Sequence, residues 1–293
     1  MDQEQLMQRW WETAYDFAQA VTSQNGEAVS ALSVPESDVD LIYRIFGFAP
    51  LVFLMKGHVN FQVLTASRAA WNKETGENVR IELLWTDERG RPAQDGQVTF
   101  HLKWMRPGWR VALIHPVEIG APLTVDDARE MYAAEQGDSY AIGLVAGTIQ
   151  VQRDGPEELD EVEERLVAGM QERRFGLPEI LTAVRLWRDF HAQTRPSYRS
   201  PAGYASAVEY IVRLLGLYEG SQAQAGEDYG VSKSTVSRNY REIRDALNIV
   251  QFDPRYGLIE DPMPDLAAAH GEMGEGAPPA IPLGFGRGQT RQT

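Results

Sequence analysis

The sequence predicts an α+β amino-terminal region followed by an all-α carboxy-terminal region. Helical periodicity dominates the residues before Pro50, and short strand-like runs separated by turn signals follow it. Helical patterns return after residue 120 and end in two segments joined by a glycine-containing turn. Helices followed by a run of consecutive strands are typical of α+β domains, because strands joined by short turns pair antiparallel.

The first helices are predicted from the spacing of apolar residues. Residues Gln3–Ala20 form an amphipathic pattern, and shorter helices are expected at Ala28–Leu32 and Ser37–Phe46. One face of the first helix carries Leu6, Trp10, Tyr15, Phe17 and Val21. This spacing approximates the 3.6-residue period that buries one side of a helix.

Runs rich in Val, Ile, Phe and Trp predict strands after Pro50. The expected strands are Leu51–Lys56, Val59–Ala66, Asn78–Thr86, Gln97–Trp104 and Trp109–Val117. Polar and apolar residues alternate within Val79–Leu83, as expected for a strand with one buried face. Turn signals at Lys56–His58, Glu88–Gly90 and Pro107–Gly108 separate the strands.

This helix–strand order carries a family resemblance. The segments 10–32, Val79–Trp85, Val98–Trp104 and Gly108–Ile114 resemble the NTF2-like (SnoaL-like, cone-shaped) superfamily, in which a closing Gly-Trp-Arg-Val strand is frequent. The resemblance covers about residues 5 to 118. It implies an amino-terminal helix pair packed into the concave face of a curved antiparallel sheet.

Helices are predicted again beyond the strands, at Leu123–Gln136, Glu157–Arg174, Pro178–Gln193 and Ala202–Leu217. The apolar, glycine-punctuated stretch Tyr140–Gln152 fits either a strand or a buried helix. The expected organisation is an NTF2-like α+β domain at 1–120, a connecting segment at 121–155, a helical domain at 156–256 and a disordered tail at 257–293.

The segment Ser221–Asn248 predicts a helix-turn-helix, a motif that places its second helix in a DNA major groove. Ser221 and Ser232 are good N-caps, and Gly230 can adopt the positive φ that ends the first helix. The helices are expected at Gln222–Tyr229 and Lys233–Leu247. Packing residues recur at helical spacing: Val231, Val236, Tyr240, Ile243 and Leu247.

Side chains off this packing face are suited to DNA, because short hydroxyls and long cations match base edges and phosphates. The predicted DNA-binding residues are Ser232, Lys233, Ser234, Thr235, Ser237, Arg238 and Arg241. Gly226 departs from the motif, where a small Ala is more usual, and weakens the first helix by about 1 kcal/mol. The alternative interpretation is a structural helical hairpin that does not touch DNA.

A second resemblance spans about residues 197 to 247. It is carried by Arg199–Ala207, Tyr210–Ile211, Gly216, Ser221–Gln222, Gly230–Ser232 and Val236–Arg241. These residues resemble the cyclin-like repeat of the general transcription factor B family, and also helix-turn-helix modules of uncharacterised bacterial proteins. In the factor-B family the equivalent turn and final helix contact promoter DNA, which implies the same seven residues. A basal initiation factor is not expected, because one repeat is visible and a zinc ribbon requires cysteine.

The charge balance limits how such a protein could hold DNA. The net charge is −14, which argues against coating nucleic acid through bulk electrostatics. Residues 196–256 contain seven Lys or Arg and seven Asp or Glu, so this segment is neutral. A homodimer is therefore expected, since two copies would double the cationic contacts.

Composition also bears on the compartment. The chain has no cysteine, which excludes disulfides and thiolate zinc sites. The polar amino terminus does not have the pattern of a signal peptide, and the longest apolar run, Ile45–Met55, is about half of a membrane span. We expect a cytoplasmic protein with no membrane contact.

Catalytic motifs are scarce. The five histidines have no metal-ligand spacing among themselves, and neither a metal nor a cofactor is expected. The cone-shaped fold can nevertheless host an enzyme pocket. Conceivable lining residues are Tyr15, Asp40, Tyr43, His58 and His101, although such residues are more often structural.

The sequence thus favours a sequence-specific DNA-binding protein of bacterial type, a transcriptional regulator without enzymatic activity. Its partner would be double-stranded DNA, and its amino-terminal domain would dimerise or sense a small apolar ligand. The alternatives are an enzyme of the NTF2-like fold with an accessory helical domain, and a protein–protein interaction module.

Overall fold

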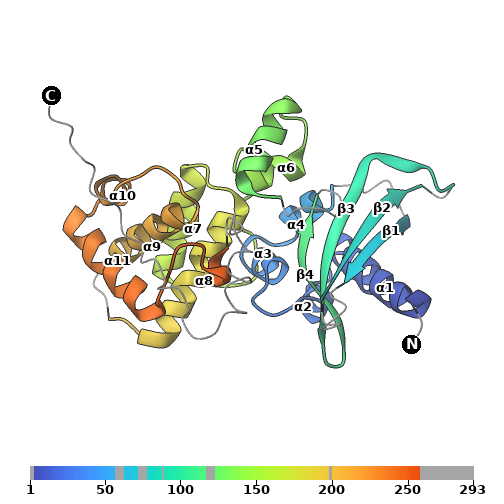
Figure 1. Ribbon diagram of the computed structural model, residues 1–293, viewed down its shortest axis with the longest axis horizontal. Helices are drawn as coiled ribbons and strands as arrows, with labels where there is room; N and C mark the ends of the chain where they lie inside the picture. Colours follow the sequence, from blue (N-terminus) through green and yellow to red (C-terminus); the bar gives the residue numbers. More distant parts are fainter. Residues whose placement is uncertain are drawn as a thin grey trace, which may run out of the picture. The chain divides into compact units, whose positions relative to one another are not determined.

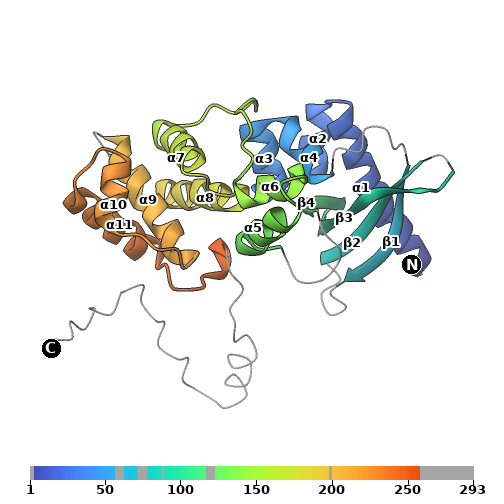
Figure 2. The same ribbon diagram turned by 90° about the horizontal axis from the view of Figure 1, so that it is seen from above.

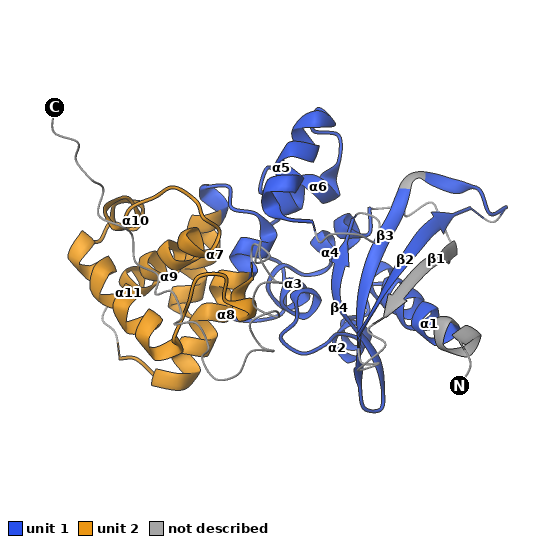
Figure 3. Ribbon diagram, in the orientation of Figure 1, with its two compact units in different colours: residues 1–159, 171–181 blue, residues 160–170, 182–293 orange. Residues whose placement is uncertain are grey.

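The computed structural model describes residues 3–56, 63–71, 78–87, 89–116, 123–197 and 200–257. Over these residues the fold is mixed α+β, with eleven α-helices and a four-stranded antiparallel sheet (Figure 1). Two compact units divide the chain: residues 1–159 with 171–181 form unit 1, and residues 160–170 with 182–293 form unit 2 (Figure 3). The predicted disordered tail lies almost entirely outside the described residues. No described helix is both long enough and apolar enough to cross a bilayer.

The helices of unit 1 that precede the sheet are α1 (Gln3–Thr22), α2 (Gly26–Leu32), α3 (Asp38–Phe46) and α4 (Phe48–Leu54). The first three confirm the predicted helices to within a few residues. Asn25 begins α2, because its side chain accepts a hydrogen bond from the Ala28 amide at 3.1 Å. Gly47, with a φ of 77°, separates α3 from α4.

The predicted strand Leu51–Lys56 is wrong, because most of it belongs to α4. Short apolar runs do not distinguish a strand from a buried helix. Here Pro50 lies in the first turn, where its missing amide proton breaks no helical hydrogen bond. Leu51 and Leu54 are both buried at helical spacing, and the Met55 carbonyl accepts a hydrogen bond from Trp85 Nε1 at 3.1 Å.

The sheet is a meander in the order β1 (Val63–Trp71), β2 (Asn78–Thr86), β3 (Pro92–Met105) and β4 (Gly108–His115). β2 has the predicted bounds, whereas β3 begins earlier than predicted. The expected strand Val59–Ala66 is described only from Val63, and β1 continues beyond its predicted end to Trp71. The expected strand Trp109–Val117 corresponds to β4, which ends at His115. Each neighbouring pair is antiparallel, and a register shift interrupts each pairing.

One face of this sheet packs on α1 (Figures 1 and 2). The cross-strand pair Ile81 and Phe100 is fully buried on this face. The Phe17 ring of α1 meets the Phe100 ring edge-on at 6.5 Å between centroids. Trp10 meets Trp109 in the same way at 5.8 Å. Two pairs of aromatic rings therefore pack between α1 and the sheet.

Two short helices complete unit 1. The capping box between Thr124 and Asp127 begins α5 (Val125–Ala134). The stretch that the sequence left ambiguous contains helix α6 (Tyr140–Ala146). Ser139 caps α6, and Gly147, with a φ of 75°, ends it in the left-handed conformation.

Unit 2 contains most of α7 (Glu161–Glu172) and α8 (Leu177–Thr194), followed by α9 (Pro201–Leu215), α10 (Gln222–Asp228), α11 (Lys233–Leu247) and a 3-10 turn at Pro254–Tyr256. Nearly every residue of α9 is buried, so α9 is the central helix of the unit. The rings of Trp187, Phe190 and Tyr204 pack together, with centroids 5.4–5.9 Å apart.

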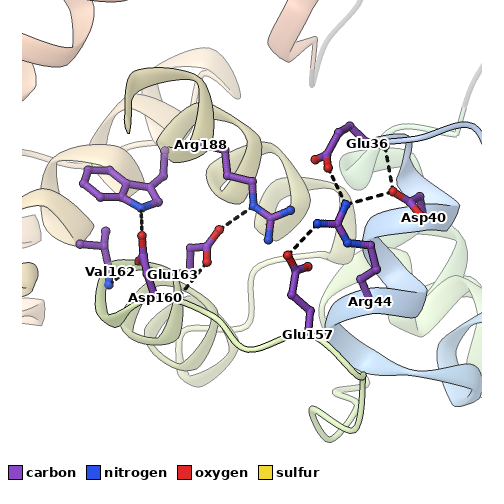
Figure 4. A network of polar contacts seen from close by, with 9 residues as sticks. Glu36, Asp40, Arg44, Glu157, Asp160, Val162, Glu163 and Arg188 are labelled. Atoms are coloured by element: carbon purple, nitrogen blue, oxygen red, sulfur yellow. Dashed lines mark hydrogen bonds and ion pairs between the residues drawn. The ribbon is translucent and has the colours of Figure 1, made fainter. Parts of the chain in front are cut away.

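A polar contact fixes the start of α7 within this core (Figure 4). Asp160 Oδ1 accepts hydrogen bonds from the amides of Val162 and Glu163, and its Oδ2 accepts one from Trp187 Nε1 at 2.7 Å. The Glu163 side chain accepts in return from the Asp160 amide at 2.9 Å. This is a reciprocal helix cap that also holds the buried indole.

Replacing Asp160 with Ala should therefore lower the free energy of unfolding of unit 2 by about 2 to 4 kcal/mol. Loss of the cap accounts for about 1 kcal/mol, and loss of the charged acceptor of Trp187 for the remainder. Urea denaturation followed by tryptophan fluorescence measures the change. The control is Glu158→Ala at a neighbouring exposed acid, which should change stability by less than about 0.5 kcal/mol. Equal stability of the two variants would contradict this role of Asp160.

Candidate nucleic-acid interface

Helices α10 and α11 lie where the sequence predicts them, with one residue of difference at the end of α10. Ser221 begins α10 by accepting a hydrogen bond from the Gln224 amide at 3.1 Å. Ser232 begins α11 in the same way, with the Thr235 amide at 3.2 Å. Gly230 lies between the helices with a φ of 67°. The hydroxyl caps and the glycine thus determine a four-residue connection.

The packing face of α11 rests on α9. Val236, Tyr240, Ile243 and Leu247 are buried as predicted, while Val231 is partly exposed. The Tyr240 ring meets Tyr210 of α9 edge-on at 5.3 Å. These contacts leave the opposite face of α11 free of the unit's own core.

At Gly203 the helix α9 lies in close contact with α11. A Cβ atom at Gly203 would lie 2.9 Å from both Asn239 Nδ2 and Thr235 Cγ2. The first half of α11 is therefore held against the start of α9, and a larger residue at position 203 would push the helices apart.

A buried charge network, which the sequence analysis missed, holds the turn. Glu209 of α9 is 0% exposed. Its Oε1 accepts from Arg213 Nη2 at 2.6 Å, and its Oε2 accepts from the Tyr229 hydroxyl at 2.7 Å. Arg213 also pairs with Asp228, the last residue of α10, at 2.9 Å. The four-residue spacing of Glu209 and Arg213 is visible in the sequence, but their contacts with Asp228 and Tyr229 are not.

Gly226, which departs from the expected Ala, has a steric explanation. A Cβ atom at this position would lie 2.6 Å from the Val231 carbonyl oxygen, and the Val231 amide donates to the Gly226 carbonyl at 2.8 Å. The backbone of the connection therefore passes directly over α10. The helix-propensity loss at Gly226 is the consequence of this close approach.

The seven predicted DNA-binding residues all lie on the surface of unit 2, between the N-cap of α11 and its ninth residue. Ser232, Lys233, Ser234, Arg238 and Arg241 are exposed, and Thr235 and Ser237 are partly exposed. Three of the hydroxyls cluster, because Ser232 Oγ lies 2.9 Å from both Ser234 Oγ and Thr235 Oγ1. The structure thus gathers hydroxyl donors and cations at one end of a single helix.

The cations of this face are tethered by neutral groups. Arg241 donates from Nε to the Ser237 carbonyl at 3.2 Å, and Arg238 donates from Nε to Asn239 Oδ1 at 3.3 Å. Neither these arginines nor Lys233 forms an ion pair with any residue that the structure describes. Their positive charge is therefore available to a ligand.

Other charges of α11 are already engaged. Arg244 pairs with Asp245 at 2.6 Å and lies 5.5 Å from the centre of the Tyr240 ring. Glu242 accepts a hydrogen bond from Tyr204 of α9 at 3.0 Å, and burial together with this carboxylate raises the pKa of Tyr204 to about 12. The cations of α11 without an ion pair among the described residues thus lie within its first nine residues.

The residues of unit 1 that could line an enzyme pocket contact separate partners. Asp40 accepts from the Glu36 amide at 2.8 Å and from Arg44 at 3.1 Å, within the cluster that Figure 4 shows. Tyr15 stacks on Trp11, and Tyr43 packs against Phe48. His58 lies outside the described residues. Among the residues that are described, no three His, Asp or Glu side chains are arranged to hold a metal ion.

His101 lies beside His115, with ring centroids 4.8 Å apart. Burial, with smaller effects of His115 and Arg80, lowers the pKa of His101 to about 3. Burial also lowers the pKa of His115, whose Nε2 has no hydrogen-bond partner among the described residues. Both imidazoles are therefore neutral at neutral pH.

Comparisons with known proteins assign no family. No family model matches the chain, and no solved structure matches it. Over 81 residues the chain is 36% identical to an uncharacterized protein, YccF, of Bacillus subtilis (strain 168). The match covers 27% of this chain and 23% of that protein, so it spans about a quarter of the relative's length.

Gly226→Ala should destabilise unit 2 by a net 1 to 2 kcal/mol, roughly, because the clash with the Val231 carbonyl outweighs the gain in helix propensity. Chemical denaturation measures the change. Gly230→Asn is the matched control: its Cβ would meet no atom within 4 Å, and Asn tolerates a φ of 67°. A stabilised Gly226→Ala protein would show that the two segments are not in this contact.

Unit 1 should lose stability as the pH falls from about 6.5 toward 3. The unfolded chain binds a proton at His101 in this window and the folded unit does not, so stability is present above the unfolded pKa and decreases below it. One proton corresponds to a slope of about 1.4 kcal/mol per pH unit. His101→Gln should flatten this slope between about pH 6.5 and 5, measured by urea denaturation. An unchanged slope would contradict a neutral, buried His101.

Proposed function

We propose that this protein is a sequence-specific DNA-binding protein, a transcriptional regulator that reads duplex DNA with a helix-turn-helix formed by α10 and α11. The observation that carries the proposal is the exposed, unpaired cationic and hydroxyl-bearing face at the start of α11. The resemblance of residues 197–247 to a repeat that contacts promoter DNA supports it.

The residues of this face divide by chemistry. Arg238 and Arg241 have the guanidinium fork that pairs bidentately with guanine O6 and N7, or with a phosphate. Lys233, at the first position of α11, carries a compact ammonium charge that is suited to contact with a phosphate. The hydroxyls of Ser234, Thr235 and Ser237 form short hydrogen bonds to base edges or to the backbone.

Sequence-specific binding also requires that α10 and α11 be held rigidly, and their attachment to α9 provides this. A recognition helix must present its side chains in one geometry, since each bidentate base contact requires alignment of both partners. The Glu209 network and the close contact at Gly203 hold α10 and α11 on the buried helix α9. The tethers from Ser237 and Asn239 restrict the two arginines in turn.

Unit 1, in this proposal, is an NTF2-like domain that dimerises or senses a small apolar ligand and has no enzymatic activity. Two pairs of aromatic rings pack between α1 and the sheet, which disfavours a polar catalytic cup there. Dimerisation suits the charge of the protein. Residues 196–256 have no net charge, so one helical module offers few cations to DNA. Two modules in a dimer would double the number of cations at one DNA site.

The combined variant Arg238→Ala with Arg241→Ala should abolish sequence-selective binding while folding persists. Each lost base or phosphate contact is worth about 1 to 3 kcal/mol, so the loss of two contacts should lower affinity by at least about 30-fold. Sequences selected from a random DNA pool by the wild-type protein supply the probe, and a gel shift measures retention.

The matched control is Arg89→Ala with Arg165→Ala, which removes the same charge at exposed arginines elsewhere. This control should bind the selected duplex as the wild type does. Full retention by the α11 variant would mean that the wrong helix has been assigned. No duplex binding by the wild type at low salt would instead favour a protein–protein interaction module.

A further inference from the structure

From residue 96 onward, the hairpin of β3 and β4 carries cations but no acidic side chain. Residues 96–116 contain no Asp or Glu, although the chain has 42 of them in 293 residues. The same segment carries Lys103, Arg106 and Arg110.

The strand register brings these cations together. Lys103 of β3 lies directly opposite Arg110 of β4, and Arg106 lies in the turn that joins the two strands. Lys103 and Arg106 are exposed, and Arg110 is partly exposed. Like charges directly opposite each other destabilise a strand pair. None of the three forms an ion pair with another residue in the described part of the chain.

The neighbouring strand adds no accessible negative charge on this face. Asn78 of β2 lies opposite Lys103, and Arg80 lies opposite His101. The acid on the same face of β2, Glu82, is 2% exposed and therefore not at the surface. The hairpin face thus keeps a repulsive arrangement of cations that an external anion would relieve.

We propose that this hairpin face, formed by Lys103, Arg106 and Arg110, binds the phosphate backbone of nucleic acid without regard to sequence. It deepens the proposed function and rests on it. The helical module of unit 2 is neutral overall, and nucleic-acid affinity depends on the number of phosphates that cations neutralise. Three unpaired cations in unit 1 supply sequence-independent affinity that the module lacks.

This face is better suited to a polyanion bound through its charge alone than to a lipid surface. Strand alternation places Trp104 and Trp109 on the face opposite to Lys103 and Arg110, where the two rings meet edge-on at 5.5 Å. Trp109 also packs on Trp10, which is 3% exposed. Trp104 and Trp109 are partly exposed, but their rings pack on each other and that of Trp109 packs on Trp10, so they are not presented for insertion into a bilayer.

The test is the full chain with Lys103→Gln, Arg106→Gln and Arg110→Gln combined. Fluorescence anisotropy with a random-sequence duplex of about 20 base pairs, titrated over a range of salt, measures affinity. Loss of three phosphate contacts should make the slope of log K against log salt shallower by about 2 to 3, and should weaken binding at least 10-fold at about 50 mM salt. The base preference measured with the selected duplex should be unchanged.

The matched control combines Arg89→Gln, Arg165→Gln and Arg195→Gln, three exposed cations elsewhere, so both proteins change from −14 to −17. The control should keep the wild-type slope. Thermal unfolding checks folding, and the hairpin variant should be at least as stable as the wild type because its like-charge pair is gone.

The outcomes separate the two proposals. If the hairpin variant keeps the wild-type slope while the Arg238 and Arg241 variant loses base preference, the hairpin inference is overturned and the proposed function stands. If the hairpin variant loses affinity while the α11 variant binds normally, the hairpin inference stands and the recognition helix has been misassigned. Hairpin-dependent binding to phosphatidylserine vesicles without binding to DNA would overturn the nucleic-acid assignment.

Discussion

The buried carboxylate of Glu209 is the constraint on which the surface of unit 2 depends. A charge without solvent must be paired, and removing one partner of a buried pair typically destabilises a protein by about 3 to 5 kcal/mol. Here the partners are Arg213 on the same helix and Tyr229 at the connection between α10 and α11. Because Arg213 also holds Asp228, one buried group determines how the helix pair is attached to α9.

The charged side chains of this protein fall into two groups, those in ion pairs and those without a carboxylate partner. Inside each unit, charged side chains are paired: Arg44 contacts Glu36, Asp40 and Glu157 in unit 1, and Arg188 contacts Glu163 in unit 2. At two surfaces, the start of α11 and the β3–β4 hairpin, the cations lack carboxylate partners among the described residues. In a protein with more acids than bases, two places where several such cations lie near one another are the features best suited to a polyanionic ligand.

Local sequence features predicted the helix ends well. The serine caps at Ser221 and Ser232 and the glycine at Gly230 act within one helical turn, so the bounds of α10 and α11 follow from neighbouring residues alone. The same reasoning recovered β2, in which polar and apolar residues alternate. It failed at Leu51–Lys56, because an apolar run without alternation carries no period and α4 is decided by burial against other elements.

The sequence by itself therefore determined the class of fold, most element boundaries and the seven residues on the outer face of α11, since caps, periodicity and side-chain chemistry are local properties. Tertiary structure alone decided the helical state of α4, the need for Gly226 beneath the Val231 carbonyl, the Glu209 network and the apposition of Lys103 with Arg110. Each of these depends on residues that are separated in the chain and meet only when the backbone folds, so no local pattern encodes it.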